Sequence, residues 1–268
     1  PGRLWRSKED TAIAASILRS QNPAWSNWRR GQDYYQEGNL LWLDADTLIR
    51  EKTGDKKSLA DFLLIFLGKG GNTGPLIVPY NFDELVADLS QVMPYDWATF
   101  LRNRVDKLNP HADVAGIERG GYKLVYKDKP SVSDRLMEHA GGRRHGSINC
   151  WYSLGLRLRG DGEISDVLWD GPADRVMVAP GYKILAVDGE IFSADALHRA
   201  IVKAKTDPAP IHVILQADNF VRTADIDYHG GERFPALEHV AGTPDYLGEI
   251  TRSLTTQEKS AEAKNSPE

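Results

Sequence analysis

The sequence is poor in cysteine and in long apolar runs, and it has no excess of positive charge. Cys150 is the only cysteine among 268 residues, so no intrachain disulfide and no Cys-x-x-Cys metal or redox motif can form. No uninterrupted apolar run approaches the roughly 18 residues that a membrane span needs. A net charge of -5 opposes the phosphate neutralisation on which sequence-independent nucleic-acid binding relies. We therefore expect no membrane span and no nucleic-acid partner.

The short motifs that place metal ligands or a nucleophile are absent too. The sequence contains no His-Glu-x-x-His, the helical motif that supplies two zinc ligands and a general base. No two of the seven histidines are four residues apart, the spacing that puts them on one face of a helix. Nothing in the sequence ties Cys150 to a histidine, so no Cys/His pair can be argued. We predict no metal site in this chain.

The composition is that of an ordinary folded protein. Hydrophobic residues make up 41% of the chain and charged residues 26%. A chain of this length can bury one large core or two modest ones, because domains commonly run to roughly 100–200 residues, and we expect two domains. The N-terminus, Pro1-Gly2-Arg3-Leu4-Trp5, lacks a charged start followed by an apolar segment, so it contains no targeting signal. Pro1 reads as an internal point of a longer chain, and the location of the protein stays open.

The first 110 residues show the 3.6-residue period of helices. Two capping boxes, Ser58 with Asp61 and Asn81 with Glu84, precede apolar runs. Gly54 is placed to end a helix in a left-handed conformation. The predicted helices cover residues 11–20 with Asp10 as cap, 39–52, 59–67, 82–93 and a run after Asp96.

From about residue 116 the period changes to that of strands. Gly160-Asp161-Gly162 is a strong hairpin signal, and Asp188-Gly189 is another turn. Residues 128–148 are polar and glycine-rich, so we expect a mobile insertion there, and residues 231–268 form a tail that we expect to be partly disordered. The predicted strands are 122–127, 152–159, 164–169, 183–187, 211–216 and 221–228, with helices near 173–177 and 193–205.

Several segments resemble the glycyl aminopeptidase family. They are Arg29-Arg30-Gly31-Gln32-Asp33-Tyr34-Tyr35, Leu43-Asp44-Ala45-Asp46-Thr47-Leu48-Ile49-Arg50, Pro94-Tyr95-Asp96-Trp97, Leu154-Gly155-Leu156 and Asp227-Tyr228-His229-Gly230-Gly231. These zinc metallopeptidases have a thermolysin-like catalytic domain followed by a PDZ domain, and the resemblance covers only their C-terminal portion. It implies an α+β chain in which a helical peptidase subdomain (1–112) precedes a PDZ-like β-barrel or sandwich (116–230).

The segment Tyr35-Gln36-Glu37-Gly38 matches a Tyr-x-x-Gly turn of thermolysin-like aminopeptidases. In that family the tyrosine hydroxyl points at the tetrahedral intermediate, and the resemblance makes Tyr35 the catalytic candidate. Gly38 would let the backbone turn tightly before the helix. Tyr34 is the second choice. The structural alternative is that both tyrosines are half-buried aromatics at a helix entrance.

Acidic residues nearby invite a metal or acid/base role. Carboxylates in the first turns of a helix are, however, expected from the helix dipole, so capping or solvated roles are favoured for Glu37, Asp44 and Asp46. Asp44 lies near the inward face of its predicted helix, where we expect a salt bridge with Arg29, Arg30 or Arg50.

In the second half, Ser153-Leu154-Gly155-Leu156 resembles the carboxylate-binding loop and following strand of PDZ domains. Backbone N–H groups of such a loop hold a peptide C-terminus while the edge strand pairs with the incoming chain. The predicted long helix would supply Ala194 and His198 to the other wall. A peptide or protein C-terminus is the partner that this resemblance implies, and a bracing role for the domain remains the alternative.

The resemblance implies a function for the whole protein. The chain would be the C-terminal portion of an aminopeptidase that removes N-terminal glycine or alanine, with one Zn²⁺ held by residues of an upstream half. The chain itself would hold no cofactor and be inactive alone. A periplasmic or cell-envelope location is compatible with the resemblance. A non-catalytic peptide-binding or scaffolding module built on a PDZ domain is the alternative from another class.

Overall fold

A computed structural model describes residues 2–19, 24–71, 74–140 and 146–253, without the side chains of 137–140. The chain is α+β, and strands first appear at Tyr122, close to where the period of the sequence changes. Two compact units are present. Unit 1 comprises Pro1–Tyr35, Val105–His111 and Leu124–Ala236, and unit 2 comprises Gln36–Arg104, Ala112–Lys123 and Leu237–Glu268. The division differs from the expected boundary at 112–116, because residues 1–35 group with the strand-rich part.

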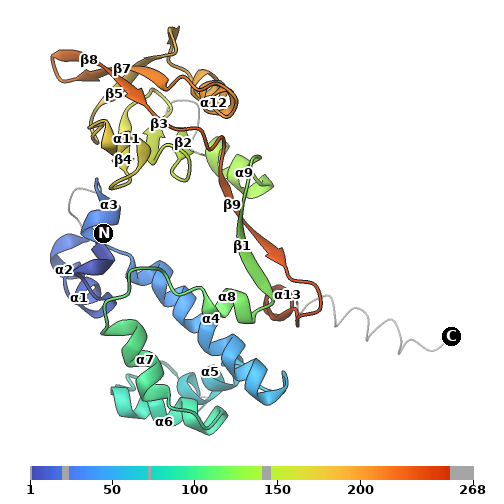
Figure 1. The fold of residues 1–268 in the computed structure, drawn as a ribbon. Coiled ribbons are helices and arrows are strands. Elements are labelled where there is room, and N and C mark those ends of the chain that lie inside the picture. The colour runs from blue at the N-terminus through green and yellow to red at the C-terminus, as the bar shows by residue number, and fades with distance from the viewer. Residues whose placement is uncertain (1, 20–23, 72–73, 141–145, 254–268) are drawn as a thin grey trace. The chain divides into compact units, whose positions relative to one another are not determined.

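Unit 1 contains most of the strands (Figure 1). One sheet has the order β2-β3-β4 and another the order β6-β5-β7-β8. The elements are η1 (Gly2–Leu4), α1 (Lys8–Ile13), α2 (Ala15–Leu18), α3 (Ser26–Arg29), α9 (Val132–Ala140), β2 (Ser147–Cys150), β3 (Leu156–Arg159), β4 (Ile164–Val167), α11 (Pro172–Arg175), β5 (Lys183–Val187), β6 (Glu190–Ile191), α12 (Ala194–Lys203), β7 (Ile211–Ala217) and β8 (Phe220–Ile226).

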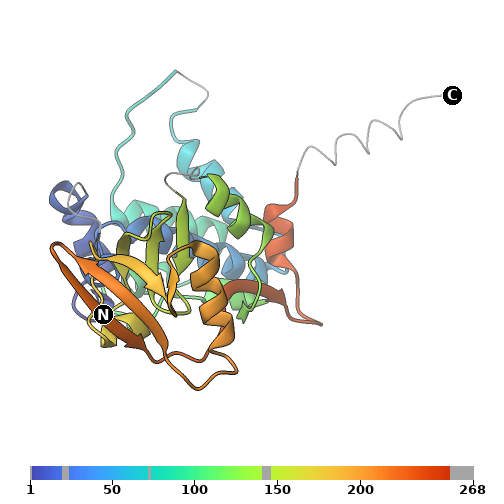
Figure 2. The same cartoon turned by 90° about the horizontal axis from the view of Figure 1, so that it is seen from above.

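The core of unit 1 lies between these strands and α12. Figures 1 and 2 both show α12 alongside the sheet that contains β5 and β7. Ser193 caps the helix as predicted, since its side chain accepts a hydrogen bond from the Ala196 amide. Leu197 and Ile201 of α12 are buried against Leu215 of β7 and the rest of the apolar cluster. The alternation of buried and exposed residues in β3 and β7 fits sheets with one covered face.

Two local expectations in unit 1 are wrong. The first helix begins at Lys8, and its cap is Ser7 rather than Asp10, because the Ser7 hydroxyl accepts from the Asp10 amide at 3.0 Å. The expected strand over 152–159 starts only at Leu156, since residues 151–155 form a turn. The mobility expected for residues 128–148 stays a prediction: the described part contains α9 and the start of β2, and residues 141–145 lie outside the described residues.

Unit 2 is mainly helical (Figure 1). Both predicted capping boxes are present, Ser58 with Asp61 and Asn81 with Glu84, and Gly54 adopts a positive φ of 61° after the longest helix. The helices are α4 (Tyr34–Thr53), whose first two residues belong to unit 1, α5 (Leu59–Leu67), α6 (Phe82–Val92), α7 (Trp97–Val105), α8 (Ala115–Arg119) and α13 (Tyr246–Thr251).

The described part of the chain after residue 230 contains a strand and a helix. Strand β9 (Phe234–His239) pairs with β1 (Tyr122–Lys127) in a two-stranded sheet, and α13 follows. The Asp245 side chain caps α13 by accepting from the Gly248 amide at 2.8 Å and also accepts from the Tyr122 hydroxyl. Residues 254–268 of the expected tail lie outside the described residues. No described helix is long and apolar enough to cross a membrane.

A buried carboxylate organises unit 2. Asp44 of α4 is fully buried and forms ion pairs with Arg104 of α7 and Arg119 of α8, not with the arginines expected from sequence. Arg119 also donates to the Asp44 carbonyl oxygen at 3.2 Å. Arg104 Nη2 forms an ion pair with Asp44 Oδ2 without a well-aligned hydrogen bond, and Arg104 Nε lies 2.9 Å from Asp113 Oδ2. Asp44 thus links three helices that are far apart in sequence.

A glycine makes this arrangement sterically possible. A Cβ atom at Gly116 would lie 2.6 Å from the Asp44 backbone nitrogen and 2.7 Å from its Cα. Real Cβ atoms do not approach backbone so closely, so α8 can lie this near α4 only with glycine there. The close approach brings Arg119, three residues on, to the Asp44 carboxylate.

We expect Asp44→Asn to destabilise unit 2 by about 3 kcal/mol, because it removes the fully buried carboxylate that pairs with both Arg104 and Arg119 and leaves these arginines only the more exposed Asp113 and Glu51. Thermal and urea unfolding, followed by circular dichroism, measure this. Asp55→Asn is the matched control: it removes the 2.7 Å ion pair between Arg50 and a more exposed aspartate, and it should cost under about 1 kcal/mol. Equal losses for the two variants would contradict the organising role of Asp44.

Candidate functional site

The proposed catalytic tyrosine lies in the first turn of α4 with its side chain in solvent. Tyr35 is 50% exposed, and Tyr34 is half-buried beside it with ring centroids 4.7 Å apart. Arg19 Nη2 donates a hydrogen bond to the Tyr35 hydroxyl oxygen at 2.9 Å, and the guanidinium carbon lies 5.7 Å from the ring centroid. Sequence reasoning missed Arg19, because nothing local links it to a residue sixteen positions away.

In this arrangement the Tyr35 hydroxyl can still donate a hydrogen bond. A tyrosine hydroxyl is both donor and acceptor, so when its oxygen accepts from Arg19 its own O–H proton is left for another acceptor. A nearby guanidinium favours negative charge developing on that acceptor. The pair therefore has the chemistry of an oxyanion donor. The catalytic role of Tyr35, or of Tyr34, stays a prediction.

The expected tight turn at Gly38 is wrong. Helix α4 begins at Tyr34, five residues before the predicted start, so Tyr35 and Gly38 both lie inside it. Gly38 has no positive φ, and a Cβ atom there would meet no other atom within 4 Å. Glycine is thus not required by the backbone or by packing in the described structure.

The segment before Tyr35 is fixed by a carboxylate from the β2-β3-β4 sheet. Asp166 of β4 is buried and accepts hydrogen bonds from the Trp25 amide at 2.7 Å and the Ser26 amide at 3.3 Å, and from the Ser26 hydroxyl. These donors open α3, so Asp166 caps that helix from 140 residues away. Trp28 of α3 stacks on Trp169, with ring centroids 4.6 Å apart.

The residues expected to bind a peptide are only partly accessible. Leu154 and Leu156 are fully buried in the core of unit 1, and Ala194 packs against the same core. Gly155 has a positive φ of 76°, and its amide donates to the Cys150 carbonyl at 3.0 Å. The Ser153 amide donates to the same carbonyl at 3.2 Å. These two N–H groups are therefore engaged within the chain.

Strand β3 cannot receive a peptide by strand addition. It pairs antiparallel with β2 along one edge, where Cys150 lies opposite Leu156, and with β4 along the other. An incoming strand needs a free edge of N–H and C=O groups, and β3 has none. The expectation that the strand after Gly155 is an edge strand is wrong. It failed because β2 lies in the segment that was expected to be mobile.

Ser153 and His198 nevertheless face a common element. The His198 ring Nδ1 lies 2.6 Å from Glu232 Oε1, and the Arg233 amide donates to the Ser153 hydroxyl at 3.2 Å. The segment that follows β8 thus lies between the loop and α12. It was expected to begin the tail, and its two polar side chains were not foreseen as part of the site. Burial raises the pKa of Tyr228, which precedes it.

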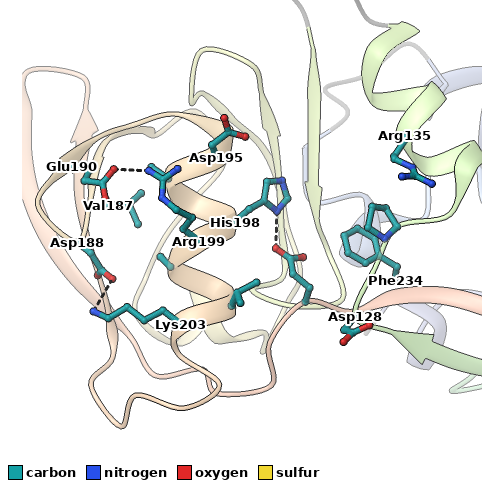
Figure 3. A pocket seen from close by; sticks show the side chains of 15 residues that line it. Asp128, Arg135, Val187, Asp188, Glu190, Asp195, His198, Arg199, Lys203 and Phe234 are labelled. Carbon is teal, nitrogen blue, oxygen red and sulfur yellow. Dashed lines mark hydrogen bonds and ion pairs between the residues drawn. The ribbon is translucent and has the colours of Figure 1, made fainter.

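A cavity of about 1010 Å³ runs over the outer face of α12 in unit 1. Figure 3 shows His198 on the side that faces Arg135 and Phe234, whereas Arg199 and Lys203 lie toward Glu190 and Asp188. Arg199 pairs with Glu190 at 2.6 Å and Lys203 lies 4.0 Å from Asp188. His198 is the one residue of the expected peptide site that lines this cavity.

The described residues do not form a metal centre. No group of three or more histidine, cysteine, aspartate or glutamate side chains in the described part of the chain lies close enough to hold an ion. Cys150 is buried in the core of unit 1. The side chain of His139 and all of His145 lie outside the described structure. The described residues therefore do not fit a zinc site.

Comparison with known proteins gives a fold. No family model and no curated protein matches the sequence. A crystal structure of an aminopeptidase N family protein from Idiomarina loihiensis matches 94% of this chain with a TM-score of 0.57 and 16% identity. The chain spans 43% of that protein. At this identity the likeness shows a shared fold, that of an aminopeptidase N family protein.

A second solved structure is the HtrA3 PDZ domain bound to a phage-derived ligand. It matches 50% of this chain and 100% of its own length, with 14% identity and a TM-score of 0.22. That score is too low to assign a shared fold.

Proposed function

We propose that the chain is the C-terminal portion of a zinc-dependent aminopeptidase that removes N-terminal glycine or alanine. The observation that carries the proposal is the fold shared with an aminopeptidase N family protein over 94% of the chain. The chain matches only 43% of that protein, which fits a portion that completes a site formed elsewhere. Zinc, if present in the whole enzyme, would be held by residues of the proposed upstream half and would polarise the scissile carbonyl there.

In this proposal, Tyr35 is the residue of the chain that takes part in the reaction. Its hydroxyl oxygen accepts from Arg19, and its proton is left to donate to the oxyanion that develops on the substrate carbonyl. An exposed phenol at the start of a rigid helix can be presented to such a substrate without rearrangement. Arg19 acts as a positioning residue, because it orients the phenol.

Peptide binding by unit 1 is the second candidate function. The observation that favours it is the large cavity over α12, with His198 and Glu232 in its lining. Strand addition at β3 is not part of this candidate, because both edges of β3 are paired. A bracing role for the strand-rich unit is supported by Asp166, which fixes the segment leading to Tyr35.

The first test is Tyr35→Phe in a chain that includes the upstream half, assayed on a chromogenic glycyl substrate. We expect kcat to fall about 10²-fold or more, with little change in KM, because the hydroxyl acts mainly in the transition state. Folding should be unchanged, since phenylalanine keeps the ring. Tyr34→Phe is the matched control and should keep normal kcat. Loss of activity in the control alone would move the role to Tyr34, and normal activity in both would remove it from this segment.

The second test separates stability from activity at Gly38. Gly38→Ala should stabilise the chain by roughly 0.5–1 kcal/mol, because alanine is a better helix former and its Cβ meets no neighbour here. In the complete peptidase the same change should lower kcat if substrate passes beside the helix at this point. Gly54→Ala, at a φ of 61°, should instead destabilise. Thermal unfolding and initial rates measure both effects, and a destabilised Gly38→Ala chain would argue against the helical position of Gly38.

A further inference from the structure

One segment of the sequence is not explained by the peptidase proposal. Residues 228–233, here called the strap, follow β8 and precede β9. The strap contains two glycines, each with a structural reason. A Cβ atom at Gly230 would lie 2.5 Å from the Tyr228 hydroxyl, and Gly231 has a positive φ of 69°. The glycine pair thus shapes the strap.

The strap is held at its start by two side chains. The Tyr228 hydroxyl donates to the Gly231 carbonyl at 2.8 Å, which closes a small loop. The His229 ring Nδ1 lies 2.8 Å from the Ala204 carbonyl at the end of α12, and Nε2 lies 3.0 Å from Asp227. The Ala204 carbonyl, followed by Asp227, raises the pKa of His229.

The next two residues of the strap bind both walls of the expected peptide groove. Glu232 places its carboxylate on His198 of α12, and its side chain is only 7% exposed. Arg233 donates its amide to the Ser153 hydroxyl, and its guanidinium lies 4.3 Å from the Tyr126 ring centroid. Tyr126 in turn packs on Tyr152, with centroids 5.3 Å apart. The strap therefore makes the contacts that an external peptide would need.

We propose that the strap is an internal ligand of the groove between the Ser153 loop and α12, and that a peptide carrying a carboxylate at the Glu232 position binds there only when the strap leaves. The inference rests on the second candidate function, peptide binding, and is independent of the peptidase assignment. The peptide needs a carboxylate because the Glu232 carboxylate is the group that contacts His198, with Oε1 2.6 Å from the ring Nδ1.

The composition of the strap makes its release feasible. Its first residue, Tyr228, packs against the apolar core of unit 1, but the residues that follow carry no apolar side chain, and their contacts with the groove are hydrogen bonds, an ion pair and a cation–π contact. The His198 side chain is 28% exposed, so water can replace Glu232 without leaving a buried unpaired group. Segments held by few apolar contacts open at lower free-energy cost than core elements.

The test supplies the strap in trans. A fluorescent peptide with the sequence of residues 228–235, YHGGERFP, is acetylated and amidated so that its glutamate is the only carboxylate. It is titrated into the full chain and into the variant Glu232→Ala/Arg233→Ala, with fluorescence anisotropy as readout. We expect the variant to bind at least about tenfold tighter than the unchanged chain, since an occupied site lowers apparent affinity by its open fraction.

Three kinds of control test whether the peptide binds at the proposed site. Glu190→Ala/Arg199→Ala removes an ion pair from the other side of α12 and should bind like the unchanged chain. The Glu232→Ala/Arg233→Ala variant is called the opened variant. Adding His198→Ala to it should abolish binding, and so should replacing the glutamate of the peptide with glutamine. A shorter peptide ending at the second glycine with a free carboxylate distinguishes a terminal carboxylate from a side-chain one. Equal binding to the unchanged and opened chains, or no binding of either peptide to the opened chain, would overturn the proposal.

A second measurement needs no opened variant. Hydrogen exchange in the unchanged chain should show a protected Arg233 amide, because it donates to Ser153. His198→Ala should raise its exchange rate about tenfold or more if Glu232 holds the strap in place. Unaltered protection in His198→Ala would show that the strap is a fixed part of the fold and not a ligand. Because neither readout involves peptidase activity, failure here leaves the role of Tyr35 untouched.

Discussion

The arrangement of unit 1 depends on one buried carboxylate. Asp166 of β4 satisfies the free amides at the start of α3 and so attaches the N-terminal segment to the β2-β3-β4 sheet. Without this acceptor, the two amides at the start of α3, which lie in partly buried positions, would lose their partner. The same segment runs on to Tyr35, and the Trp28–Trp169 stack adds apolar contact beside the cap. Asp166 therefore attaches to the sheet the segment that leads to the candidate tyrosine.

Several features with a local cause were predictable from sequence, although the Ser7 cap and the helical position of Gly38 were not, and features with a distant cause were not predictable. Both capping boxes and the positive φ of Gly54 depend on residues a few positions apart, and all three are found. The partners of Asp44 and Asp166 come from up to 141 residues away, and no sequence pattern names them. Pairing of β2 with β3 is also non-local. Local signals started the strand at residue 152 rather than at Leu156 and could not show that this strand is internal.

The glycines show why the local backbone conformation around the candidate residues was difficult to predict from sequence. Gly38 was assigned a turn, yet it lies inside α4, because a glycine in sequence does not reveal whether its freedom is used. Gly230 and Gly231 were placed at the edge of a tail, yet both are required by the strap. The difference lies in what surrounds each residue: open space at Gly38, the ring of Tyr228 at Gly230. Such surroundings exist only in the folded chain.

The start of α4 departs from two local rules of helix stability. In α4 a glycine occupies a helix interior where alanine would fit, and an aromatic ring is left half in water beside it. Each departure costs stability, glycine by roughly 0.5–1 kcal/mol relative to alanine. Departures of this kind concentrate at functional sites, where stability is given up for access. Further along, α4 buries the apolar residues Leu41, Ala45 and Ile49. Packing therefore explains the sequence of that part of the helix, but it does not explain the residues around Tyr35.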